Sequence, residues 1–151
     1  MQIQPSLVEV RAAGPDDAAV VLTMVREIAA HEGDVSDVSG TSDTWAAMLA
    51  RPDVLVLIAE RDGRQVGYVS AVRKLHLWLG TDILVLDDVY VREGSRDAGV
   101  GRLLMTRLAA LAAPEQLLIR WEMREDNVAA QRFYRRLGAS LRTKVIAFWR
   151  P

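Results

Sequence analysis

The first strands of the chain are marked by runs of apolar residues between turns. Residues 7–13 alternate between apolar and polar positions, which is typical of a half-buried strand. Residues 53–60 contain a continuous run of valine, leucine and isoleucine, and an Asp-Gly turn at 61–64 joins it to a returning strand at 65–73. This pattern predicts a hairpin. A fourth strand is predicted over 82–91.

Apolar positions at helical spacing alternate with these strands along the chain. The predicted helices cover residues 15–31, 42–51, 98–112 and 127–137. Strand 82–91, helix 98–112 and a returning strand at 116–123 follow one another, and such a unit places its two strands parallel through a right-handed crossover. A last strand is predicted over 141–149. We therefore expect one domain, residues 1–151, with a mixed α/β fold.

The composition narrows the chemistry that the chain can perform. At 151 residues the chain has the length of one average domain, and it contains no cysteine. Thiol nucleophiles, iron–sulfur clusters and cysteine-type zinc sites are therefore excluded, and with only two histidines, His31 and His76, we expect no metal site. No apolar stretch approaches the roughly 18 residues that span a bilayer, and the N-terminus has no leader pattern, so we expect a cytoplasmic protein without membrane contact.

Charge is distributed unevenly although the net charge is only −1. Residues 1–75 contain seven Lys and Arg against eleven Asp and Glu, a balance of −4, whereas residues 76–151 contain twelve against nine, a balance of +3. A basic half suits a phosphate-bearing cofactor and an acidic half suits a cationic substrate, although scattered surface charge explains the distribution equally well. Since no basic run is interleaved with aromatic residues, we expect no nucleic-acid partner.

A glycine-containing segment at 96–101, Arg-Asp-Ala-Gly-Val-Gly, lies between a predicted strand and a predicted helix. Glycines let the backbone approach a ligand closely, and the first helical turn offers unpaired N–H groups at the positive end of the helix dipole. This arrangement indicates a pyrophosphate site; the alternative is a turn needed only for tight packing. A Walker loop is excluded because no Gly-Lys-Ser/Thr follows, and Leu104 stands where a dinucleotide fingerprint requires its third glycine.

A second candidate segment lies on the predicted helix at 127–137. Asn127 and Tyr134 are seven residues apart, so they lie on one helix face two turns from each other, and Ala130 between them leaves room for a ligand. Both polar groups can then face one cleft. The alternative for Tyr134 is a half-buried core tyrosine whose hydroxyl meets water or a carbonyl.

Taken together, the two segments resemble the GNAT family of N-acetyltransferases. The cofactor loop of that family, Gln/Arg-x-x-Gly-x-Gly/Ala, is matched by Arg96, Gly99 and Gly101, and its later Asn-x-x-Ala-x-x-Phe-Tyr-x-x-x-Gly segment is matched from Asn127 to Gly138. The resemblance implies a mixed, mostly antiparallel central sheet flanked by helices, with a parallel strand pair around an acyl-CoA cleft. It also implies an enzyme that transfers an acetyl group from acetyl-CoA to a primary amine by direct attack in a ternary complex. Dimers are common in such families, so a homodimer is compatible with the resemblance, although no motif of the sequence encodes the oligomeric state.

The resemblance assigns the cofactor to residues on both sides of the cleft. It implies that the following residues bind acetyl-CoA: Val89, Tyr90, Val91, Arg96, Asp97, Ala98, Gly99, Val100, Gly101, Arg102, Asn127 and Tyr134. The strand backbone at 89–91 would pair with the pantetheine arm, and the amides at 97–102 would hold the pyrophosphate. Tyr134 would also be the general acid that protonates the departing thiolate, which suits a phenol with a pKa of about 10 beside a thiolate with a pKa of about 8.5.

Two neighbouring acids, Asp87 and Asp88, lie on the predicted strand beside the cofactor. An alkylammonium with a pKa of about 10.4 is charged at neutral pH, so it must lose a proton before it attacks. The two acids resemble the acidic pair at this strand in polyamine-type acetyltransferases. Because side chains alternate along a strand, only one of them is expected to face the cleft, and we favour Asp87 as the base, with Asp88 almost equally supported. The alternative is an acid that caps a bulge or pairs with an arginine.

The loop after the first helix usually forms the acceptor side in this family. The predicted substrate-binding residues are His31, Glu32 and Asp34, and two further acids, Asp37 and Asp43, follow them. A cationic acceptor is therefore expected: a polyamine, an amino sugar or a lysine side chain. The alternative is a solvated acidic loop.

Two other functions stay open. A non-catalytic acyl-CoA-binding regulatory domain is favoured by Asp97, which stands where family members commonly have glycine and where a carboxylate opposes a pyrophosphate. An enzyme that acetylates a protein lysine or a protein N-terminus needs an open groove, which a sequence does not reveal.

Overall fold

The computed structural model describes residues 7–96 and 99–151. These residues belong to two compact units, one that ends at Trp121 and one that comprises Glu122–Pro151. In the described part of the chain, the first unit contains one sheet and three α-helices, and the second contains one α-helix and irregular backbone.

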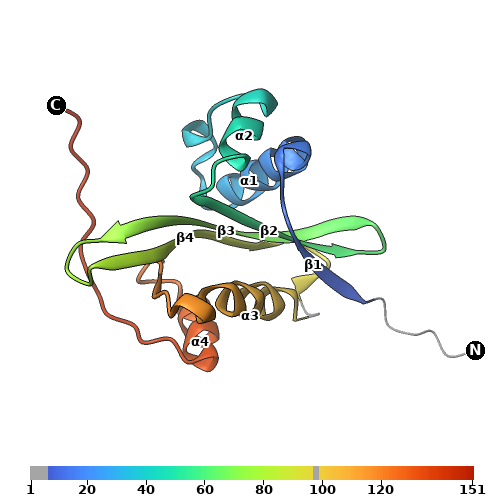
Figure 1. Cartoon of the computed structure of the whole chain (residues 1–151). Helices are drawn as coiled ribbons and strands as arrows, with labels where there is room; N and C mark the ends of the chain where they lie inside the picture. The colour runs from blue at the N-terminus through green and yellow to red at the C-terminus, as the bar shows by residue number, and fades with distance from the viewer. Residues whose placement is uncertain (1–6, 97–98) are drawn as a thin grey trace, which may run out of the picture. The chain divides into compact units, whose positions relative to one another are not determined.

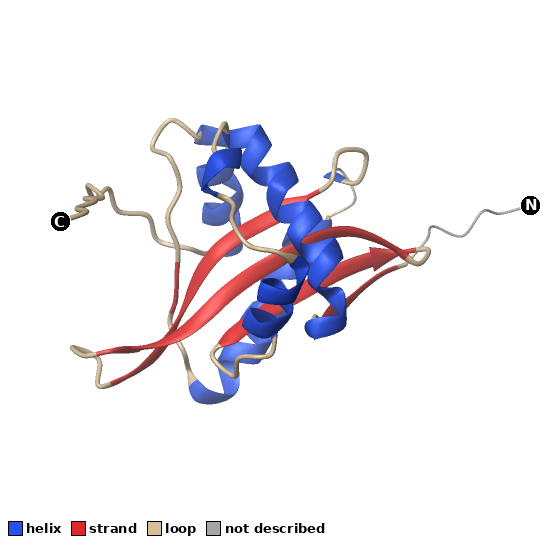
Figure 2. Cartoon of the chain, turned by 90° about the horizontal axis from the view of Figure 1, so that it is seen from above, coloured by secondary structure: helices blue, strands red, loops and turns tan. Residues whose placement is uncertain are grey.

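The sheet of the first unit contains five strands that lie side by side in the order of the sequence (Figures 1 and 2). They are β1 (Val8–Ala12), β2 (Val54–Arg61), β3 (Arg64–His76), β4 (Thr81–Val91) and β5 (Ile119–Arg120). The first four pair antiparallel in succession, and β5 pairs parallel with β4. The predicted mixed, mostly antiparallel sheet with one parallel pair is therefore confirmed.

Helices cover both faces of this sheet. They are α1 (Ala18–Glu32), α2 (Ser42–Leu49) and α3 (Val100–Ala112), while α4 (Val128–Leu137) belongs to the second unit. Figure 1 shows α1 and α2 on one face and α3 on the other, where it connects β4 to β5. Each of the four lies within a few residues of its predicted bounds. Short 3₁₀ turns flank them at Pro15–Asp17, Val35–Asp37 and Ala113–Glu115.

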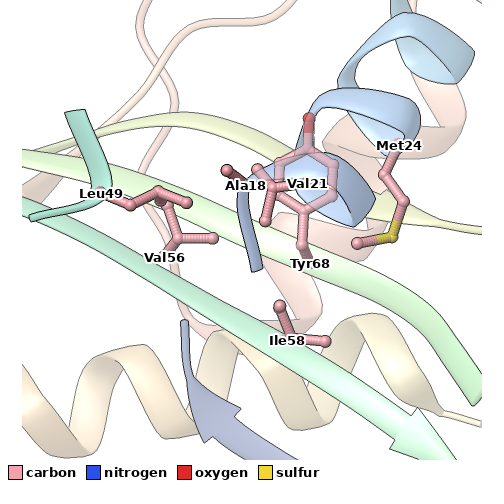
Figure 3. Packing of buried hydrophobic residues seen from close by; sticks show 7 residues of the cluster. All are labelled: Ala18, Val21, Met24, Leu49, Val56, Ile58 and Tyr68. Carbon is pink, nitrogen blue, oxygen red and sulfur yellow. The ribbon is translucent and has the colours of Figure 1, made fainter. Parts of the chain in front are cut away.

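The core between α1, α2 and the sheet contains one tyrosine among aliphatic side chains. Its buried members are Ala18, Val21 and Met24 of α1, Leu49 of α2, Val56 and Ile58 of β2, and Tyr68 of β3 (Figure 3). Val21 and Met24 follow Ala18 at helical spacing, so one face of α1 lies on the strands. Tyr68 has no exposed surface, and a phenol can be buried in this way at low cost only if its hydroxyl has a partner.

One residue of β4 is extra in its pairing with β3. Ser70 lies opposite Asp88, but the next residue of β3, Ala71, lies opposite Leu86, so Asp87 has no residue opposite it. Such a β-bulge bends the strand and interrupts the regular alternation of its side chains. The bulge therefore falls within the predicted acidic pair.

The prediction of a strand over 141–149 is wrong. This segment has irregular backbone, and Val145, Phe148 and Trp149 are 96%, 89% and 88% exposed. Its β-branched and aromatic residues favour a strand, but a strand forms only where a neighbouring edge accepts its hydrogen bonds, and none of the described residues pairs with it. The strand predicted over 116–123 is likewise reduced to β5, which is two residues long.

Gly67 of β3 allows a close approach between β3 and β4. A Cβ atom at this position would lie 2.5 Å from the carbonyl oxygen of Tyr90, well inside van der Waals contact. We therefore expect Gly67→Ala to push the two strands apart and to lower the free energy of unfolding by about 1–3 kcal/mol, measured by urea denaturation.

Gly14→Ala is the matched control. A Cβ atom at Gly14 meets nothing within 4 Å, and the residue has an ordinary φ of −126°. Its free energy of unfolding should change by no more than about 0.5 kcal/mol. Equal stability of the two variants would contradict the close approach at Gly67.

Candidate functional site

The β-bulge places both aspartates of the predicted acidic pair on one face of the sheet. Residues directly opposite each other on neighbouring strands share a face. Asp88 therefore shares the face of Ser70. Val85 shares the face of Val72. Asp87 is two residues further along β4, so its side chain lies on the same face as that of Val85. Since Ser70 and Val72 alternate onto the same face, so do both carboxylates, and the bulge replaces the regular alternation expected for this strand; which of the two takes part in the reaction stays a prediction.

Asp88 is held in place from β3. The phenolic hydroxyl of Tyr68 donates a hydrogen bond of 2.9 Å to Asp88 Oδ2, and the backbone N–H of Asp88 donates one of 3.2 Å to Ser70 Oγ. The Tyr68 ring also makes an edge-to-face contact with Tyr90, with ring centroids 6.1 Å apart. Tyr68 is a site residue that we did not predict, because a tyrosine in an apolar strand gives no signal until the register identifies its partner.

Burial and charge shift the pKa values of these groups. Burial raises the pKa of Asp88 above the ordinary aspartate value, and the hydrogen bond from Tyr68 opposes this shift. Partial burial, followed by the charge of Asp88, raises the pKa of Asp87. Burial and the charges of Asp88 and Glu32 raise the pKa of Tyr68, so its hydroxyl remains a donor throughout the neutral range. Shifted carboxyl groups of this kind are typical of functional sites.

The C-terminal end of α1 lies near this pair. Glu32, the last residue of α1, is close enough to Tyr68 for its charge to raise the pKa of the tyrosine. His31 Nε2 lies 3.2 Å from a guanidinium nitrogen of Arg96. Of the three predicted substrate-binding residues, all of them exposed, the structure thus brings His31 to the loop after β4 and Glu32 close to Tyr68 of β3, whereas Asp34 lies in the turn after the helix.

Two arginines connect the end of β4 to its surroundings. Arg92 Nε donates to Glu27 Oε2 of α1 at 2.9 Å, and Arg92 also donates to the Gln65 carbonyl at 3.0 Å. Arg96 Nε donates to the Val91 carbonyl at 3.1 Å. These contacts hold the strand with the two aspartates against α1, and they place the predicted cofactor residue Arg96 between β4 and α1.

The outer edge of β4 offers backbone hydrogen-bonding groups beyond the bulge. β5 pairs with β4 at Leu84 and Val85, and among the described residues no strand lies along the edge of 89–91 opposite β3. Open edge groups bind an extended ligand through the hydrogen bonds that a further strand would make. The backbone at 89–91 therefore fits the predicted pantetheine site.

The N-terminus of α3 fits a pyrophosphate. Gly99 precedes the helix in a left-handed conformation with φ 71°, and no side chain of the described residues caps the first turn. The N–H groups of that turn, at Val100, Gly101 and Arg102, lie at the positive end of the helix dipole, where an anion is favoured. A Cβ atom on Gly99 would meet nothing within 4 Å, so the space beside it is open. The predicted residues at 97–98 lie outside the described residues.

The second unit contains the other two predicted residues. Asn127 is the N-cap of α4, because its Oδ1 accepts a hydrogen bond of 3.1 Å from the Ala130 N–H, and Gly138 ends the helix in a left-handed conformation. Tyr134 is half-buried, and its ring centroid lies 5.2 Å from that of Phe133. The predicted helix and its glycine cap are confirmed, while the roles of Asn127 and Tyr134 toward the cofactor stay predictions.

Residues 7–96 and 99–151 contain neither a cluster of metal-ligating side chains nor a helix that could span a membrane. In that part of the chain, no three His, Cys, Asp or Glu side chains lie together in a way that could hold a metal ion. No helix there is long and apolar enough to cross a membrane.

Sequence comparison identifies acetyltransferases as relatives of this chain. Residues 22–139 match the model of the acetyltransferase (GNAT) family. An uncharacterized N-acetyltransferase of Mycobacterium tuberculosis is 33% identical over 110 residues, which are 72% of this chain and 67% of the relative.

The fold is similar to solved acetyltransferase structures. An aminoglycoside acetyltransferase from an uncultured soil metagenomic sample, crystallised in complex with sisomicin, superposes with a TM-score of 0.81 at 14% identity, and the match covers 95% of each chain. An aminoglycoside N-acetyltransferase in complex with CoA superposes with a TM-score of 0.79 at 14% identity, over 99% of each chain. At this level of identity the similarity establishes the fold.

Proposed function

This chain belongs to the acetyltransferase (GNAT) family, and we propose that it transfers an acetyl group from acetyl-CoA to a primary amine of a small, cationic acceptor. It is an N-acetyltransferase, like the relatives that are similar to it in sequence. The observation that supports this reaction best is the acidic pair of Asp87 and Asp88 on one face of β4, next to a strand edge and a helix N-terminus that suit acetyl-CoA.

Acetyl-CoA would bind along the end of β4 and the loop that follows it. The backbone at 89–91 would pair with the pantetheine arm, since the described strands leave that edge open. The amides at 97–102 would bind the pyrophosphate, and Asn127 of the second unit would contact the cofactor as well. The CoA complex of a structural neighbour supports a ligand of this class.

The charges around the acidic pair support a cationic acceptor. Asp87 and Asp88 share a face of the sheet. The negative charge of Glu32 lies close enough to raise the pKa of Tyr68, the residue that donates a hydrogen bond to Asp88. An acceptor with several ammonium groups is attracted by such a set of carboxylates. Because a structural neighbour binds sisomicin, aminoglycosides are the first acceptors to test, with polyamines and lysine side chains as alternatives.

The proposed reaction is a direct attack within a ternary complex. One aspartate of the pair takes a proton from the acceptor ammonium, and the neutral nitrogen then attacks the thioester carbonyl carbon, so that a C–N bond forms and the C–S bond breaks. The leaving sulfur takes a proton from the Tyr134 hydroxyl, and the second proton lost by the nitrogen restores the tyrosine. An ammonium and a thioester thus become an amide, a thiol and one released proton.

The proposed function predicts that the full chain binds acetyl-CoA and releases thiol when an amine is present. Calorimetric titration with acetyl-CoA measures binding, and a thiol-release assay with an aminoglycoside, a polyamine and a lysine-containing peptide measures transfer. We expect binding, and release with the aminoglycoside or the polyamine but not with the peptide. Release with the peptide alone would favour a protein acetyltransferase. Binding without any release would favour a regulatory domain, and absence of binding would contradict the proposed function.

Tyr134→Phe tests the proposed general acid. Phenylalanine keeps the ring beside Phe133 but has no proton to donate, so kcat should fall by about 10²–10⁴-fold, while the Kd for acetyl-CoA should stay nearly the same. Phe133→Leu is the control, because it alters the neighbouring ring and keeps the hydroxyl. An unchanged kcat in Tyr134→Phe would remove the tyrosine from the reaction.

A further inference from the structure

We propose that Tyr68 positions Asp88, and that this makes Asp88, rather than Asp87, the carboxylate that takes the proton of the acceptor amine. The inference rests on the proposed function. The family resemblance favours Asp87, so the geometry points to a different assignment within the pair.

The Tyr68 ring has little freedom to move. Its side chain has no exposed surface and belongs to the same cluster as Ala18, Val21 and Met24 of α1. Figure 3 shows the ring extending from β3 toward α1, with the hydroxyl oxygen at its far end. A donor that is fixed by packing fixes its acceptor too, so the 2.9 Å hydrogen bond restrains the carboxylate of Asp88.

Asp88 is anchored at two points, one on its side chain and one on its backbone. The hydroxyl of Tyr68 occupies Oδ2, and Ser70 Oγ accepts the backbone N–H at 3.2 Å. In the proposed step the proton of the acceptor goes to Oδ1, the oxygen that does not accept from Tyr68. A general base that is oriented by a further group is the usual arrangement in enzymes that activate a nucleophile.

Asp87 lacks a comparable anchor. It is the extra residue of the bulge, it is exposed, and within the described residues no side chain hydrogen-bonds to its carboxylate. A carboxylate that no side chain anchors keeps its rotamer freedom, which opposes a fixed geometry for proton transfer. The charge of Asp87 serves instead to attract the cationic acceptor.

Tyr68 also influences the protonation of Asp88. A hydrogen bond donated to the ionised carboxylate favours that form, whereas burial favours the neutral form. Asp88 is thus kept more basic than an ordinary aspartate while its anion is held by a donor. The other titratable groups that act on these residues are Glu32 of α1 and Tyr90 of β4, which act on Tyr68, and Asp87, whose pKa is raised by the charge of Asp88. Glu27 of α1 and Arg92 and Arg96 after β4 act on the neighbouring Tyr90.

Tyr68→Phe tests the inference, because it keeps the ring and removes only the hydroxyl. Loss of a donor to the ionised form raises the pKa of Asp88, so the acid limb of the pH profile of kcat/KM should move to higher pH by about one unit. On that limb kcat/KM should be about tenfold lower than in the wild type. The loss should appear in kcat, and the KM for the acceptor should change little, because Tyr68 is buried and acts through Asp88.

Ile58→Val is the matched control. Ile58 is fully buried and lies opposite Tyr68 in the same core, so the smaller side chain weakens packing without removing a hydrogen bond. Its pH profile should remain that of the wild type. An acid limb that does not move in Tyr68→Phe, or that moves equally in both variants, would overturn the inference.

Asparagine variants distinguish the two carboxylates. Asp88→Asn should remove the acid limb and lower kcat by about 10²–10⁴-fold, whereas Asp87→Asn should keep the limb and lose less activity. The reverse result would assign the proton to Asp87 and overturn the inference.

A measurement without substrate distinguishes failure of this inference from failure of the proposed function. NMR titration of the Asp88 carboxyl group in the full chain should give a higher pKa in Tyr68→Phe than in the wild type. That result without turnover on any amine would contradict the proposed function, and with it the proton transfer to Asp88. Turnover together with an unchanged Asp88 pKa would overturn the role of Tyr68 alone.

Discussion

A single extra residue in β4 is the constraint on which the site depends. Up to Leu86, β4 stays in step with β3, and its side chains alternate between the two faces of the sheet. The bulge at Asp87 interrupts this alternation and brings two carboxylates to one face. Directly beyond it, the backbone at 89–91 has an edge that β5 does not occupy. The acidic pair and the proposed cofactor edge are therefore neighbours on one strand.

The hydrophobic core supplies the Tyr68 hydroxyl, whose hydrogen bond lowers the cost of burying the carboxylate of Asp88 beside that of Asp87. Packing against α1 places the Tyr68 hydroxyl next to Asp88, and each of these groups would be costly to bury without the other. The hydrogen bond therefore serves stability as well as orientation. Residues that pack the sheet against α1 thus determine where a carboxylate points and how readily it takes a proton, which connects the fold to the proposed function.

The sequence predicts the elements of this chain better than the contacts between them. The hairpin of β2 and β3, the β4–α3–β5 unit and the glycine cap of α4 are confirmed because short-range patterns determine them. The bulge leaves no mark in the composition of β4, since it exists only in the pairing with β3. The contacts of Tyr68 with Asp88 and of His31 with Arg96 join distant segments and depend on that register. The strand over 141–149 fails for a related reason, because propensity without a partner edge forms no strand.

The most direct test of the bulge is whether the two carboxylates influence each other in solution. NMR titration of Asp87 in the wild type should give a pKa above the ordinary aspartate value, because partial burial and the charge of Asp88 both raise it. In Asp88→Asn the neighbouring charge is absent, so the pKa of Asp87 should fall toward the ordinary value. An Asp87 pKa that is the same in both proteins would contradict the close approach of the two carboxylates that the bulge is inferred to produce.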